Sequence, residues 1–106
     1  WAIEPEHAAI LSGEHVGTHI QMGIGDGVIP KVLNQNIYED IVIVTDEEAL
    51  QTAKDLARLE GLMCGISSGT NVAAALKLAK KLGKGKTVVP LLPDTAERYF
   101  STPLFG

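Results

Sequence analysis

Short β-branched runs alternate along the chain with longer segments whose apolar residues recur at helical spacing. Residues 41–44, Ile-Val-Ile-Val, form a continuous run that predicts a strand buried on both faces. Residues 1–4 indicate the end of another strand, which Pro5 stops because proline cannot donate to a ladder. Residues 62–66 and 87–89 are similar short runs, so we expect two further strands there.

Helix signals lie between these runs. Thr45 and Glu48 form a capping box, in which the threonine hydroxyl accepts from the N–H three residues on and the glutamate reaches back. The helix that they start is expected to reach Glu60 and to end at Gly61. A second helix is expected where residues 67–71 turn away from a strand, with an apolar face formed by Val72, Ala75, Leu76, Ala79 and Leu82.

The order of these elements predicts the fold class. Two shorter helices are expected over residues 6–11 and around residues 31–33, each after a proline. Strands that alternate with helices predict right-handed parallel crossovers. We therefore expect an α/β fold with a layered open sheet, mostly parallel, and flanking helices. Residues 1–106 contain no internal repeat and no linker, which predicts a single segment of one domain.

Composition narrows the functional classes. The 106 residues are 45% hydrophobic and carry 9 basic against 13 acidic side chains, a net charge of −4 that argues against binding to nucleic acids or to anionic membranes. No apolar run approaches the roughly 20 residues of a membrane span. One cysteine, Cys64, excludes an internal disulfide framework and indicates a reducing, cytoplasmic compartment. Because the chain opens on Trp1 in an apolar run, we expect it to be cut from a longer protein.

The strongest candidate for chemistry is the strand-to-helix turn of residues 65–70, Gly-Ile-Ser-Ser-Gly-Thr. Ligands of open parallel sheets bind beyond the carboxyl ends of strands, and free N–H groups at a helix start favour an anion or a polar ring atom. The alternative is ordinary capping, in which Ser67 or Ser68 bonds the helix's own N–H groups and binds no ligand. The residues alone favour capping.

A second candidate is the glycine loop, residues 23–27, Gly-Ile-Gly-Asp-Gly. Alternate glycines let a backbone approach a ligand closely, although a purely structural loop explains the pattern equally well. The three histidines, His7, His15 and His19, lack the companion ligands of a metal site, so no metal is expected. Cys64 lies in an apolar run without a neighbouring base, which favours a buried, inert thiol. Residues 93–99 indicate a polar turn.

Several motifs occur together in a specific order and spacing. They are Glu4-Pro5, the glycine loop with Ile29-Pro30, residues 44–49 (Val-Thr-Asp-Glu-Glu-Ala), Glu60-Gly61-Leu62, residues 65–69, residues 85–89 (Gly-Lys-Thr-Val-Val), and Glu97-Arg98-Tyr99 with Ser101-Thr102. This ordered set resembles the C-terminal third of the cysteine synthases, also called O-acetylserine sulfhydrylases, which are pyridoxal-phosphate enzymes of fold type II. The resemblance covers essentially all 106 residues, so it implies a partial fold of a larger enzyme.

The resemblance implies a reaction and a cofactor. In that family O-acetylserine and sulfide give cysteine and acetate by β-replacement through an aminoacrylate, with pyridoxal 5′-phosphate as cofactor. By similarity, Ser67 hydrogen-bonds the pyridine nitrogen of the cofactor, and Gly23, Ile24 and Gly25 line the mouth of the active site. The Schiff-base lysine of the family belongs upstream of Trp1, so we expect no catalytic residue in this chain and no activity from the chain alone.

The resemblance also implies partners and alternatives. Members of the family form homodimers and bind the C-terminal tail of serine acetyltransferase in the active-site cleft. Residues 19–22, His-Ile-Gln-Met, and Asp26 depart from the usual family pattern. These departures leave open an O-phosphoserine sulfhydrylase or a cystathionine β-synthase-like enzyme. A non-catalytic fragment that serves as an interaction module is the alternative from a different class.

Overall fold

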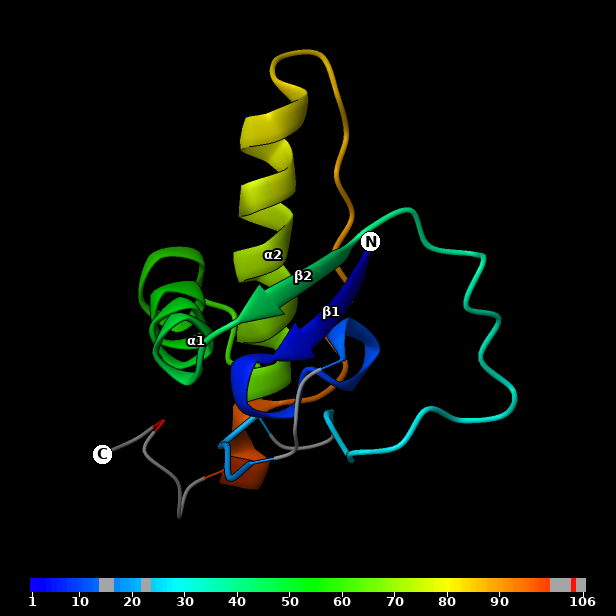
Figure 1. The fold of residues 1–106 in the computed structure, drawn as a ribbon. Helices are drawn as coiled ribbons and strands as arrows, with labels where there is room; N and C mark the ends of the chain where they lie inside the picture. The colour runs from blue at the N-terminus through cyan, green and yellow to red at the C-terminus, as the bar shows by residue number, and fades with distance from the viewer. Residues whose placement is uncertain (14–16, 22–23, 100–103, 105–106) are drawn as a thin grey trace.

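A parallel pair of strands and two packed helices form the main body of the protein (Figure 1). The structure is a computed structural model, and it describes residues 1–13, 17–21, 24–99 and 104. The strands are β1 (Ala2–Pro5) and β2 (Ile41–Val44), and the helices are α1 (Asp46–Glu60) and α2 (Ile66–Leu82). Three short 3-10 helices complete the elements, η1 (Glu6–Ala8), η2 (Ile10–Ser12) and η3 (Ala96–Tyr99). The predicted α/β class with parallel strands is confirmed.

The two strands pair in parallel, so their carboxyl ends lie at the same level. Ala2 faces Ile41 and Pro5 faces Val44. Pro5 is the last residue of β1 rather than a stop before its end, because its extended backbone (φ −64°, ψ 144°) continues the strand geometry. The expectation that β2 is buried on both faces is wrong: Val44 is fully buried, but Ile43 is 39% exposed.

The strands expected over residues 62–66 and 87–89 are absent from the described residues. The first forms only one antiparallel bridge, between Cys64 and Thr95, and Ile66 already begins α2. Residues 87–89 lie outside any ladder, and the proline that follows them at position 90 lacks the N–H that would extend one. A strand needs a partner, and short hydrophobic runs alone do not reveal whether one is within reach.

The two short helices predicted from sequence take other forms. Residues 6–11 form parts of η1 and η2, separated at Ala9, whose backbone (φ −81°, ψ 63°) is not helical. Residues 31–33 form a turn, in which the Leu33 amide donates to the Pro30 carbonyl at 3.0 Å. In both places proline starts a single turn that does not propagate, since a helix gains stability only as further bonds are added.

Both ends of α1 are as predicted. The Glu48 amide donates to the Thr45 hydroxyl at 3.1 Å, and the Thr45 amide donates to the Glu48 carboxylate at 2.9 Å. The helix ends at Gly61, which adopts the left-handed conformation (φ 70°) that favours glycine. Lys77 of α2 lies 3.0 Å from the Glu48 carboxylate and links the start of α1 to the second helix.

The core lies where α1 and α2 pack against each other and α2 packs against both strands. Gly69 of α2 faces the Ala49 carbonyl and Ala53 of α1, and a Cβ placed on Gly69 would overlap the Ala49 carbonyl oxygen. The buried residues around this contact are Val44, Ala49, Ala53, Ile66, Ala73, Ala74, Ala96 and Leu104. Small side chains dominate, so the helix backbones themselves approach closely.

Gly69→Ala tests this close approach. The substitution gains about 1 kcal/mol of helix propensity, but the new methyl group meets a backbone carbonyl that cannot rotate away. We expect a net loss of roughly 2 kcal/mol in the free energy of unfolding, measured by urea denaturation. Ala79→Gly, at an exposed position of the same helix, isolates the propensity change. A Gly69→Ala protein that is more stable than the parent would contradict the packing described.

The capping box predicts a dependence of stability on pH. The Thr45 amide bond holds the pKa of Glu48 below its usual value, partial burial opposes this and Lys77 adds to it. Folding therefore lowers this pKa, so the contribution to stability is complete above the unfolded value of about 4.3 and disappears as the pH falls through the lower folded value. Glu48→Gln should lose less stability than the parent between about pH 6 and pH 3.

The matched control for this measurement is Glu47→Gln, at an exposed position in the same turn. Its pH profile should run parallel to that of the parent protein. Identical slopes for the parent and Glu48→Gln would show that the capping carboxylate does not carry the effect.

Candidate functional site

Three segments that are distant in sequence meet at the carboxyl ends of the two strands. β1 and β2 end at Pro5 and Val44, and the first turn of α2 lies at the same end of the molecule (Figure 1). Residues 17–21 and 24–27 return to this end through contacts with Pro5, Val44 and Thr70. Ligands of open α/β sheets bind at such an edge.

Ser67 lies in the first turn of α2 and is 4% exposed. Gly65 is the N-cap residue, and no side chain caps the helix. The alternative that Ser67 or Ser68 caps the helix with its side chain is therefore wrong. Because the first N–H groups of a helix have no partner within the helix, this end carries donors and a partial positive charge.

One hydroxyl in this turn lacks a hydrogen-bond partner among the described residues: Ser68 is fully buried and its Oγ has no partner there. Ser67 precedes it in the same turn and is nearly as buried. A buried hydroxyl without a partner costs about 1–3 kcal/mol, and a bound polar group can recover that cost. The turn is thus chemically suited to a ligand that presents a hydrogen-bonding ring atom.

Gln21 forms a buried polar network that sequence reasoning missed. Its Nε2 donates to the Val44 carbonyl at 3.0 Å and to Asp46 Oδ1 at 2.9 Å, and its Oε1 accepts from the Thr70 hydroxyl at 2.8 Å. The Ile20 amide also donates to Asp46, at 3.2 Å. We call Gln21, Asp46, Thr70 and the Val44 carbonyl the Gln21 network. No local pattern predicts these bonds, because the partners lie 23 to 49 positions away.

The glycine loop packs against the end of β1. Gly25 has φ +69°, and a Cβ placed on it would lie 2.7 Å from Pro5 and 3.0 Å from both Ala8 and His19. Ile24 is partly buried, whereas Gly23 lies outside the described residues. Only glycine satisfies both the backbone conformation and the space at position 25, so the loop backbone runs directly over the strand end.

His19 ties the loop to its own stem. Its Nδ1 accepts from the Gln21 amide at 3.1 Å, and its Nε2 lies 3.3 Å from the Gly25 carbonyl. A carbonyl only accepts, so the two contacts together require the neutral tautomer with hydrogen on Nε2. Of the other histidines, His7 lies 3.9 Å from Glu6 and His15 falls outside the described residues. Within the described ranges no cluster of three or more metal-ligating side chains is found.

Glu4 is a buried carboxylate with a local structural role. It is 5% exposed and accepts from the amides of Leu11, at 2.6 Å, and Ser12, at 3.2 Å. The Ser12 hydroxyl lies at 3.2 Å as well. These bonds fold η1 and η2 back over β1. A pocket of about 220 Å³ beside them is lined by Glu4, Pro5, Ala8, Leu11, Gly25, Asp26, Val28 and other residues of this edge.

The lysines of α2 lie far from its first turn. Lys77 pairs with Glu48, and the Lys81 ammonium lies 5.1 Å from the centre of the Trp1 ring. Both occupy the last two turns of α2, so at about 1.5 Å per residue they are at least ~15 Å along the axis from Ser67. These cations cannot reach a group bonded to Ser67.

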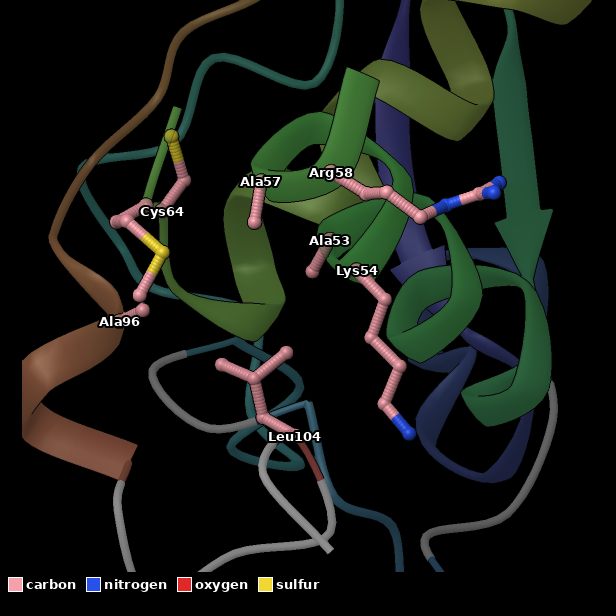
Figure 2. A pocket seen from close by; sticks show the side chains of 8 residues that line it. Ala53, Lys54, Ala57, Arg58, Cys64, Ala96 and Leu104 are labelled. Atoms are coloured by element: carbon pink, nitrogen blue, oxygen red, sulfur yellow. The ribbon is translucent and has the colours of Figure 1, made fainter. Parts of the chain in front are cut away.

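A separate pocket of about 320 Å³ lies between α1, Cys64, Ala96 and Leu104 (Figure 2). Lys54 and Arg58 extend from α1 away from Cys64 in this view. Cys64 is 8% exposed, and burial together with the nearby charge of Asp94 raises the pKa of its thiol. The thiol thus stays protonated at neutral pH, which agrees with the prediction of a buried, inert cysteine.

Comparisons with known proteins identify the family. The chain matches the profile described as "Pyridoxal-phosphate dependent enzyme" over residues 1–94. Cysteine synthase of Staphylococcus aureus (strain Mu50 / ATCC 700699) is 49% identical over 105 residues, 99% of this chain and 34% of that protein. The crystal structure of cysteine synthase (OASS) from Entamoeba histolytica has a TM-score of 0.94 at 39% identity and covers 98% of this chain and 31% of that chain.

A third relative widens the range of chemistry. The crystal structure of O-acetylserine dependent cystathionine beta-synthase from Helicobacter pylori has a TM-score of 0.89 at 38% identity, over 98% of this chain and 34% of that chain. The chain therefore belongs to the pyridoxal-phosphate dependent enzyme family, and its fold is that of the matched part of the cysteine synthases. The resemblance noted from sequence motifs is confirmed. The chain spans about a third of the length of these relatives.

Pyridoxal phosphate is the cofactor of this family. The first turn of α2 fits it, because the buried Ser68 hydroxyl without a partner among the described residues, the neighbouring Ser67 hydroxyl and the N–H groups at the helix start can bond to a polar ring atom. No helix among the described residues is long and apolar enough to cross a membrane.

A comparison of Gly25→Ala with Gly13→Ala separates the cost of the backbone conformation at Gly25 from the cost of its close packing on neighbouring residues. Both glycines have positive φ, but only Gly25 has atoms within 4 Å of the added methyl group. Gly13→Ala should cost about 1 kcal/mol in unfolding free energy for the backbone alone. Gly25→Ala should cost a further ~1–3 kcal/mol for the overlap with Pro5 and Ala8. Equal losses in a denaturation experiment would mean that the loop is not packed on β1.

Proposed function

We propose that the chain forms part of a pyridoxal-phosphate-dependent cysteine synthase, which converts O-acetylserine and sulfide into cysteine and acetate. The observation that carries the proposal is the Ser67 hydroxyl. Ser67 is 4% exposed and lies in the first turn of a helix that no side chain caps, beside the strand ends, in a chain of this family. The 49% identity to a cysteine synthase supports the same assignment.

Ser67 is proposed to bond the ring nitrogen of the cofactor. The cofactor, when bound, supplies an electron sink for negative charge at the α-carbon of the substrate. A serine hydroxyl can donate to a neutral ring nitrogen, whereas a carboxylate there would hold that nitrogen protonated. Ser67 would thus leave the ring nitrogen unprotonated, which would favour elimination of a β-substituent over reactions that need full stabilisation of the carbanion.

Gly23, Ile24 and Gly25 are proposed to line the mouth of the active site. The backbone at Gly25 packs directly on Pro5 and Ala8, which holds the loop at the end of β1. The pocket of about 220 Å³ beside the loop is lined by mostly apolar side chains together with Glu4 and Asp26, and it gives the loop an open cavity beside it. No group of this chain is assigned a proton-transfer role.

The two enzyme alternatives differ from the proposed enzyme in the donor substrate or in the acceptor substrate. O-phosphoserine is one alternative, and the similarity to an O-acetylserine dependent cystathionine beta-synthase supports homocysteine-type acceptors as another. Residues 19–22, which depart from the family pattern, are proposed to influence this choice because they lead directly into the glycine loop. An interaction module without catalysis remains the alternative from a different class, and retention of cofactor by the protein would count against it.

The remaining features of the proposal concern the context of the chain. We place residues 1–106 as a C-terminal segment of the catalytic domain, in a cytoplasmic homodimer that can bind the C-terminal tail of serine acetyltransferase. Several large apolar side chains are exposed, among them Val32, Ile37, Val89 and Leu91, and these support burial against further polypeptide. Cys64 as a free thiol is compatible with a reducing compartment.

Ser67→Ala in the cofactor-loaded enzyme tests the assignment. Loss of one hydrogen bond should weaken cofactor retention by about two- to ten-fold and shift the absorbance of the bound cofactor. Ser68→Ala removes the neighbouring buried hydroxyl, and the proposal predicts a smaller loss of cofactor retention for it than for Ser67→Ala. Cofactor binding can be followed by dialysis with absorbance detection. Equal retention and identical spectra for Ser67→Ala and the parent would remove Ser67 from the cofactor site.

A further inference from the structure

Gln21 occupies an unusual place for a glutamine. It is fully buried, although burying an amide without partners would cost several kcal/mol. All three of its side-chain bonds join groups from different elements: the last carbonyl of β2, the first residue of α1, and Thr70 in α2. Both amide hydrogens and the amide oxygen are used, so the side chain has one allowed orientation.

The hydrogen-bonding groups around Gln21 exclude a carboxylate or an apolar side chain at this position. The Val44 carbonyl and Asp46 both need a donor, whereas the Thr70 hydroxyl, oriented as observed, needs an acceptor. Glutamine offers both at one carbon. A glutamate would turn acceptors toward a carbonyl and a carboxylate. An apolar side chain would remove all three bonds, which would leave Asp46 with the Ile20 amide and Thr70 with the Ile66 carbonyl, each at 3.2 Å.

The network connects two parts of the proposed site. Gln21 lies on the stem of the glycine loop, where its own carbonyl accepts from the Ile24 amide at 3.4 Å. Thr70 lies three residues after Ser67, which is about one turn along α2. The amide of Gln21 therefore fixes the distance between the glycine loop and the helix turn that carries Ser67.

We propose that Gln21 is a positioning residue for the cofactor and substrate site. It acts through Thr70 on the turn of Ser67 and through its backbone on residues 24–25, without itself contacting the ligand. This inference rests on the proposed function, because it assigns the network to the site in which Ser67 holds the cofactor. The residue is thus expected to control both cofactor retention and the apparent affinity for substrate.

The experiment uses the cofactor-loaded enzyme and four variants. Gln21→Met removes all three bonds at similar volume. Thr70→Val keeps the shape of the side chain and removes the Gln21–Thr70 bond together with the 3.2 Å contact of the same hydroxyl with the Ile66 carbonyl. Thr70→Ser restores the hydroxyl. Gln51→Glu is the matched control, because the Gln51 amide also donates to an aspartate, Asp55 at 3.0 Å, but at an exposed site on α1.

We expect Gln21→Met to weaken cofactor retention and raise KM for the β-substituted serine at least ten-fold, with a smaller change in kcat. Thr70→Val should shift the cofactor spectrum in the same direction as Ser67→Ala and weaken retention several-fold. Thr70→Ser should recover most of the parent's behaviour, and Gln51→Glu should leave all of these quantities unchanged. The effects of Gln21→Met and Thr70→Val should be non-additive, because they break a shared bond.

Hydrogen exchange of the cofactor-free protein supplies a readout that a purely structural role would not produce. A positioning role predicts several-fold faster exchange confined to the peptides that contain residues 17–27 and the first turn of α2. General destabilisation would instead raise exchange in all elements together. If Gln21→Met fails to fold, the difference in local exchange between Thr70→Val and Thr70→Ser provides the same test.

Folded variants that retain cofactor, KM and local exchange as the parent does would overturn the inference while leaving the proposed function intact. A parent enzyme that neither binds pyridoxal phosphate nor forms cysteine would overturn both. Uniform loss of exchange protection in Thr70→Val would assign the Gln21 network to stability alone and would equally overturn the positioning role.

Discussion

The close approach of α2 to α1 at Gly69 is the constraint on which the arrangement of the rest depends. Because position 69 has no side chain, the backbone of α2 can lie against the Ala49 carbonyl and Ala53. That contact sets where α2 begins relative to the start of α1 and the end of β2. A larger separation would carry Thr70 away from Gln21, since their hydrogen bond is only 2.8 Å long.

Apolar packing and polar hydrogen bonds have different roles near the strand ends. The helices meet through alanine and glycine, which bury little area per residue but permit backbone contact. The carboxyl edge instead holds Gln21, Asp46 and Thr70, whose bonds fix directions as well as distances. A buried polar network specifies one arrangement when every member is satisfied. Ser67 and Ser68 are buried beside that network, and the Ser68 hydroxyl has no partner among the described residues.

Local signals in the sequence predicted local structure well. The capping box of Thr45 and Glu48 and the terminal Gly61 act within one helix, so their residues identify both ends of α1 without knowledge of the fold. The β-branched run predicts the strand β2 correctly. It does not predict the exposure of Ile43, because burial depends on which segments cover that face of the strand. The prediction of a strand over residues 62–66 is wrong for a similar reason. Whether a short apolar run forms a strand depends on a pairing partner elsewhere in the chain.

The sequence predicts only those site residues that belong to a local motif. Ser67 and Gly25 were singled out from their neighbours in sequence and from the resemblance to a family. Gln21 gave no such signal, because its meaning comes from Val44, Asp46 and Thr70, which no spacing rule connects to it. Asparagine and glutamine are common on surfaces, so a fully buried glutamine is recognised only once the fold is known.

The parallel pairing of β1 with β2 has a consequence for the order of folding. Each residue of β1 pairs with one 39 positions later, as Ala2 with Ile41 and Pro5 with Val44, whereas only residues 61–65 separate α1 from α2. Closing the longer loop costs more chain entropy and is the slower event. The helix pair can therefore form early, while the edge that gathers the glycine loop is completed late. The glycine loop is then expected to open more readily than the helix turn that carries Ser67.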